Sequence, residues 1–181
     1  MKGYLISLWG IIDPFYYYCS RLTYLPNDNI FRIRLTKYKG RNVVLSDGTQ
    51  INKNDTLLKI HLHNVRLMKE LKNVKNELKK AKIIYRYVQR SMPGLELYLR
   101  HHCPSRTKAI IGITLLNKGC ERLGFEIFDI RHPAYKWLKW CSFLPIEMLS
   151  SNKSAAAILK NHRPKYLFIS KEKLVKLYRT D

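Results

Sequence analysis

The spacing of hydrophobic residues changes once along the chain, and this change limits the folds that the sequence can adopt. Between residues 30 and 62 apolar and polar residues alternate, as at Ile33 and Leu35 with their basic neighbours. A period of two is typical of a half-buried strand. From Val65 onward apolar residues recur every three or four positions, as in an amphipathic helix. The sequence therefore predicts an α+β fold.

Turn signals divide residues 30–62 into a small antiparallel sheet. Asp47-Gly48 predicts a tight turn because glycine accepts a positive φ, and Asn54 suits a left-handed position in the next turn. The Asn64 side chain is expected to cap the helix that follows.

Periodicity and turn residues predict the other elements. Ser91 and Pro93 resemble a fresh helix start, with a serine cap and a proline in the first turn. Further strands are expected over residues 107–116, 125–130 and 165–169, and helices over residues 4–24, 64–90, 92–102, 133–148 and 171–179. A chain of 181 residues suits a single domain, residues 1–181.

The chain is strongly basic, since 34 Lys and Arg oppose 13 Asp and Glu, a formal net charge of +21. Repulsion between like charges destabilises a compact protein, and binding to a polyanion relieves it. The expected partner is an anionic polymer, either envelope polysaccharide or nucleic acid. An anionic membrane surface, or no polyanionic partner at all, are the other interpretations.

The cysteines and the N-terminal segment indicate the compartment. Cys19, Cys103, Cys120 and Cys141 are scattered and form no CxxC pair, which is typical of a reducing environment. The nine-residue apolar run Tyr4–Ile12 is too short for a bilayer span, which needs about 20 residues. No small-residue cleavage site follows it. We therefore expect a cytoplasmic protein with neither signal peptide nor transmembrane span.

Motifs for phosphate loops, nucleophile elbows and paired zinc ligands do not occur, so neither cofactor nor metal is expected. His61 and His63 share one strand face, where two imidazoles can transfer protons, and Asp55 could add a carboxylate. The alternative is structural: each histidine ends a strand on its wetter side, and Asp55 satisfies turn amides. His101-His102-Cys103 supplies only two ligands that converge easily, fewer than an open zinc site needs.

Basic residues follow one face of the helix expected after residue 64. The residues expected to contact a polymer are Asn64, Arg66, Lys69, Lys72, Arg106, Arg122 and Trp140. Cations hold phosphates, and an exposed aromatic ring stacks on bases or sugar rings. The same residues also fit an ordinary solvated surface.

The segment YKGRNVVLSDGTQINKNDTLLKIHLHN, residues 38–64, resembles the YkoP-like domain of spore-forming Firmicutes. Residues 112–116 and 121–128 are also similar, so the likeness spans most of the chain; the matching residues in the first segment are Asp47, Gly48, Ile51, Asp55, His61, Leu62 and Asn64. Asn54 departs from the family's usual glycine. The resemblance implies an accessory module, often found beside polysaccharide deacetylase-type enzymes of the cell envelope, and points to His61 and Asn64 for any site.

The preferred hypothesis is a non-catalytic binding module for an anionic polymer. The alternative is a small enzyme that acts on a phosphorylated or glycan-derived substrate through His61, His63 and Asp55, with Arg106 or Arg122 holding the anion. A concave pocket joining residues 55–64 to one of these arginines would favour the enzyme. A nucleic-acid-binding protein is a further alternative.

Overall fold

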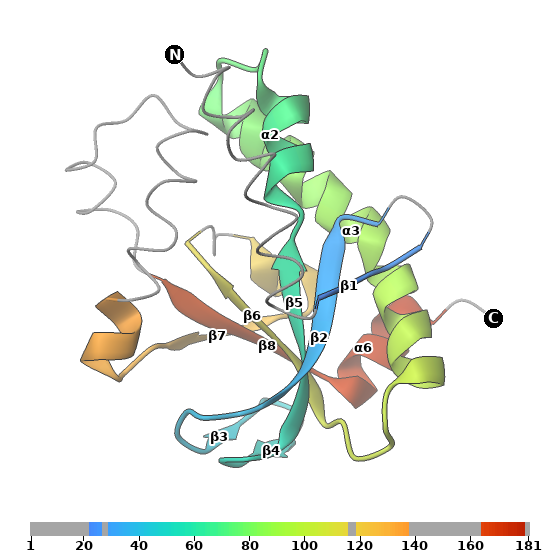
Figure 1. Cartoon of the computed structure of the whole chain (residues 1–181), viewed down its shortest axis with the longest axis vertical. Helices are drawn as coiled ribbons and strands as arrows, with labels where there is room; N and C mark the ends of the chain where they lie inside the picture. The colour runs from blue at the N-terminus through green and yellow to red at the C-terminus, as the bar shows by residue number, and fades with distance from the viewer. Residues whose placement is uncertain (1–21, 27–28, 116–118, 138–163, 180–181) are drawn as a thin grey trace.

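The computed structural model describes residues 22–26, 29–115, 119–137 and 164–179, and a six-stranded sheet lies at its centre (Figure 1). The strand order is β1 (Thr23–Tyr24), β2 (Phe31–Lys37), β5 (Thr56–Leu62), β6 (Ala109–Thr114), β8 (Lys165–Ser170) and β7 (Glu126–Asp129). Neighbours are antiparallel except β5 and β6, which are parallel. The predicted α+β class is confirmed, and the later strands join the same sheet as the first ones.

The alternating segment folds as its turn residues predict. β2 and β5 pair in continuous antiparallel register. Between them β3 (Val43–Val44) and β4 (Gln50–Ile51) form a separate two-stranded hairpin. Gly48 has a φ of 84° in the hairpin turn, and Asn54 has a φ of 71° in the turn that follows. Both turn predictions are therefore confirmed.

The basic segment after β5 forms two helices, α2 (Asn64–Leu71) and α3 (Glu77–His102), so the prediction of one helix over residues 64–90 is wrong. The Asn76 side chain starts α3 by accepting a hydrogen bond from a backbone amide three residues on, at 3.1 Å. Such a cap is worth about 1 kcal/mol. Leu78, in the first turn of α3, is 78% exposed, so burial of this side chain does not favour a continuous helix.

α3 continues through Pro93, so the predicted helix start at Ser91 is wrong and residues 92–102 belong to the same helix. Ser91 instead anchors the start of β2: its hydroxyl accepts from the Ile30 amide at 3.0 Å, and its carbonyl accepts from the Asn29 side chain at 2.9 Å. An internal proline costs about 3 kcal/mol. Burial contributes about 1.5–3 kcal/mol for each large apolar side chain, and three on this helix are buried: Met92, Leu95 and Leu99.

Hydrophobic clusters cover both faces of the sheet. The larger cluster lies on the side of α3 and α6 (Lys171–Tyr178), where it includes Leu58 and Ile60 of β5. The smaller cluster includes Phe168 of β8 and residues that flank the β3–β4 hairpin. Because side chains alternate along a strand, Lys59 and His61 lie on the face turned away from α3.

Several predicted helices lie partly outside the described residues. Of the helix expected over residues 4–24, only the end is described, and there Thr23–Tyr24 forms β1 instead. Of the helix expected over residues 133–148, residues 133–137 are helical. A short 3-10 helix, η1 (Cys120–Leu123), precedes β7. None of the described helices combines the length and the apolar character that crossing a membrane requires.

Candidate functional site

The two histidines lie where β5 leads into α2, beside a buried arginine. His61 pairs with Arg32 across β5 and β2. Nη2 of Arg32 lies 3.2 Å from Nδ1 and 3.1 Å from Nε2 of His63. The same guanidinium lies 4.9 Å from the centre of the Tyr24 ring. Arg32 is only 2% exposed, whereas Tyr24 is 43% exposed and both histidines are half-buried, so the cluster extends from the interior to the surface.

His63, and not Asn64, caps α2. Nδ1 of His63 accepts a hydrogen bond from the Arg66 amide at 3.3 Å, and Asn64 is the first helical residue. A ring nitrogen that accepts a hydrogen bond carries no proton, so the cap requires a neutral imidazole. The predicted cap is therefore wrong by one residue, and His63 has a structural role.

A row of basic side chains extends this cluster across the sheet. Arg34 lies opposite Lys59, next to the pair of Arg32 and His61. Like charges opposite each other on neighbouring strands are destabilising, and buried charges need partners. Each of these four residues makes further interactions in the structure. The row therefore belongs to the internal polar network of the fold.

Asp55 lies at the other end of β5 from the histidines. Asp55 directly precedes β5, His61 lies near the far end of the strand and His63 just beyond it, so roughly 20 Å of extended chain separates Asp55 from His61. The Asp55 carboxylate accepts from the Lys108 ammonium at 2.8 Å and from the Asn52 amide at 2.7 Å. Burial raises the pKa of Asp55, but these hydrogen bonds lower it more, so the net pKa lies below its usual value. His61, His63 and Asp55 do not form one site.

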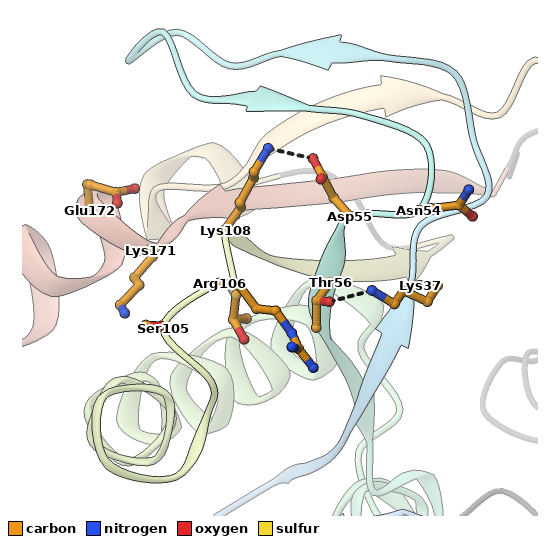
Figure 2. Close-up of a pocket in the computed structure, with 10 residues that line it drawn as sticks. Lys37, Asn54, Asp55, Thr56, Ser105, Arg106, Lys108, Lys171 and Glu172 are labelled. Carbon is orange, nitrogen blue, oxygen red and sulfur yellow. Dashed lines mark hydrogen bonds and ion pairs between the residues drawn. The ribbon is translucent and has the colours of Figure 1, made fainter.

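A cavity of about 450 Å³ lies on the Asp55 side, where the starts of β5, β6 and α6 meet (Figure 2). Four cationic side chains line it: Lys37, Arg106, Lys108 and Lys171. Lys37 donates to the Thr56 hydroxyl at 2.9 Å, and Lys108 is paired with Asp55. The cavity thus joins residues 55 and 56 to Arg106, as the enzyme hypothesis requires, but the histidines lie outside it.

α2 and the first half of α3, which carry a second concentration of charge, lie at the opposite end of the molecule from the starts of β5, β6 and α6 (Figure 1). We define the basic arm as residues 64–90, which comprise α2, the connection after it and the first half of α3. Its exposed cations are Lys69, Lys72, Lys75, Lys79, Lys82, Arg86 and Arg90. Among the ion pairs of the described residues, the one in the arm joins Glu77 to the buried Lys80 at 2.9 Å. The exposed cations are therefore available for a ligand.

The other predicted binding residues differ in their surroundings. The Arg66 guanidinium lies 5.6 Å from the centre of the Tyr87 ring, so it links α2 to α3. Arg122 is exposed on η1, apart from the cavity lining and the arm. Trp140 lies outside the described residues. In the part of the chain that the structure describes, no three His, Cys, Asp or Glu side chains are grouped so that they could hold a metal ion.

Reasoning from sequence missed Lys37, Lys108 and Lys171 as neighbours. They meet because β5 and β6 run parallel from the same edge of the sheet and because α6 starts directly at the end of β8. The local signal for this last junction is Ser170, whose hydroxyl caps α6 by accepting from the Lys173 amide at 3.0 Å. A cap signal places a helix start along the chain but does not say which strands lie beside it.

Comparisons with known proteins agree with the resemblance seen in residues 38–64. The sequence matches the YkoP domain over residues 2–178. It is 49% identical over 181 residues to the uncharacterized protein YkoP of Bacillus subtilis (strain 168), with 98% of each chain covered. No solved structure shows a significant match. On the extent of both sequence matches, this chain belongs to the YkoP family.

Proposed function

We propose that this protein is a non-catalytic module that binds an anionic polymer through its basic arm. The observation that supports the proposal is the set of seven exposed cations on the arm, none of which forms an ion pair among the described residues. Between residues 64 and 90 the sequence has nine Lys and Arg and only two Glu. A row of phosphates or carboxylates along the arm would relieve the repulsion among these charges.

The composition of the arm favours recognition of a charged backbone. Five of the seven exposed cations are lysines, whose compact ammonium groups bind phosphates as point charges. Specific reading of bases relies more on bidentate arginine contacts. An envelope polyol phosphate and a nucleic acid share this repeated phosphate chemistry, so a binding experiment has to compare them.

The test is a titration of labelled poly(glycerol phosphate), heparin and single-stranded DNA, with neutral dextran as reference, from about 50 to 200 mM salt. The arm variant Lys69→Gln/Lys72→Gln/Lys82→Gln is compared with Arg41→Gln/Lys53→Gln/Lys176→Gln, which removes the same charge from exposed positions outside the arm. Each lost phosphate contact with a single-stranded polymer should reduce the magnitude of the slope of log K against log salt by about 0.7.

We expect the arm variant to bind at least one polyanion about 30-fold more weakly than the wild type, with a salt slope whose magnitude is smaller by about 2. The control variant should lose less than about threefold. Equal losses in both variants would mean that net charge, and not the arm, carries binding. Absence of binding to all three polyanions at low salt would also refute the proposal.

A further inference from the structure

We infer that the cavity between the starts of β5, β6 and α6 binds the phosphate group of a small phosphorylated molecule, independently of the basic arm. The first observation is a buried hydroxyl. Thr107 lines the cavity and is 1% exposed, and its Oγ1 has no hydrogen-bond partner among the described residues. A buried polar group without a partner costs about 1–3 kcal/mol, and a phosphate oxygen in the cavity would accept its hydrogen bond.

The second observation is that two of the cations lining the cavity have no carboxylate partner among the described residues. The lining side chains of Arg106 and Lys171 form no ion pair within the described part of the chain. Figure 2 shows the Arg106 side chain extending toward Thr56, which Lys37 reaches from β2. A guanidinium binds two oxygens of one phosphate, and a nearby ammonium adds a third contact. Cations from separate elements therefore line one open cavity.

Backbone hydrogen bonds hold these elements together. The Lys108 amide donates to the Thr56 carbonyl at 3.3 Å, and the Lys171 amide donates to the Lys108 carbonyl at 3.0 Å. The Lys173 amide is taken by the Ser170 cap. Two of the first three amides of α6 are thus occupied, and the helix end contributes mainly its positive field. Anion binding therefore falls to the side chains that line the cavity.

Two carboxylates also line the cavity and limit which anions it accepts. Asp55 is neutralised by Lys108, whereas Glu172 is exposed at the start of α6. The remaining lining cations still outnumber this one carboxylate. A volume of about 450 Å³ falls in the range of small-molecule pockets and exceeds the needs of a single phosphate. The geometry suits a phosphate monoester with a polar organic part.

The experiment is isothermal titration calorimetry at about 50 mM salt with inorganic phosphate, glucose 6-phosphate and AMP as probes. Thr107→Val keeps the side-chain shape and removes only the hydroxyl, and Arg106→Gln removes the guanidinium. Arg122→Gln is the matched control, because Arg122 is also exposed but lies outside the cavity lining. Urea unfolding of each variant separates lost binding from lost folding.

We expect at least one phosphate ester to bind, about 10-fold more weakly to Thr107→Val and about 50-fold more weakly to Arg106→Gln. Arg122→Gln and the neutralised arm variant should bind it as the wild type does. Thr107→Val should be at least as stable as the wild type, because it removes a buried hydroxyl that has no hydrogen-bond partner among the described residues. The inference would be overturned if none of the three probes bound, or if Thr107→Val and Arg106→Gln both bound the ester as tightly as the wild type does. Either result would leave the arm proposal untouched.

Discussion

The ammonium of Lys108 lies 2.8 Å from the carboxylate of Asp55, and this ion pair fastens the start of β6 to the start of β5. These strands are the one parallel pair of the described sheet. They are joined by a long connection that carries α2 and α3, so no hairpin turn fixes their register. The ion pair and the cavity therefore both depend on how β5 is aligned with β6.

Asp55→Asn should lower stability at neutral pH but not in strong acid. The folded-state pKa of Asp55 lies below its unfolded value of about 3.9. Its contribution is therefore complete above that value and is lost as the pH falls through the folded pKa. We expect a loss of about 1 kcal/mol at pH 7, measured by urea unfolding, that disappears near pH 2. A difference that does not change with pH would contradict this assignment.

His63→Ala should destabilise the protein through loss of the α2 cap. Removing a side-chain cap costs about 1 kcal/mol, and the contact between His63 and Arg32 is lost as well. His63→Asn should recover most of the stability, because asparagine also caps helices well. Thermal unfolding of both variants and of the wild type measures these differences in stability. Equal stability of His63→Ala and the wild type would return His63 to the list of candidate functional residues.

Cys103 and Cys120 should react slowly with thiol reagents. Burial raises the pKa of each to about 11, an effect that Lys171 partly offsets at Cys103 and that Glu121 increases at Cys120. The thiolate is the reactive form, so at pH 8 we expect rates about 100-fold below those of a free thiol, rising about tenfold per pH unit up to pH 10. Disulfide-exchange kinetics in a Cys19→Ser/Cys141→Ser background measures this. Rapid reaction of either thiol at pH 7 would rule it out.

Arg100→Ala should be the most destabilising of these changes. Glu96 is fully buried, and its carboxylate lies 3.0 Å from Nε of Arg100. Removing Arg100 leaves this buried carboxylate without its ion-pair partner, and because the Arg100 side chain is itself 32% exposed we expect a loss of about 1–3 kcal/mol. The matched control is Lys165→Ala, which breaks a more exposed pair with Asp129 at 3.6 Å and should cost less than about 1 kcal/mol.

The double variant Glu96→Leu/Arg100→Leu completes this test. It removes both charges and should recover most of the stability lost in Arg100→Ala, because no buried carboxylate is then left without its partner. Chemical unfolding of the three variants under one condition gives the comparison. Equal losses in Arg100→Ala and Lys165→Ala would show that burial of Glu96 does not control the energetics.

Local signals in the sequence determined the parts of the fold that neighbouring residues control. The period of two places β2 and β5, and Gly48 and Asn54 place the turns, because these preferences act within a few residues. The same local reasoning went wrong at Ser91 and Pro93, where a start signal competes with burial of the C-terminal half of α3. It was also wrong at Asn64, since His63 was the residue with a ring nitrogen positioned to cap α2.

Only the tertiary structure decided which charged residues meet. Asp55 precedes His61 by six positions, but an extended strand holds them at opposite ends of β5. Lys37, Arg106 and Lys171 are far apart in sequence and line one cavity. Composition determined that the protein is basic, because charge is a sum over the chain. Where that charge concentrates depends on strand pairing and on where helices begin, which the cooperative packing of the whole sheet determines.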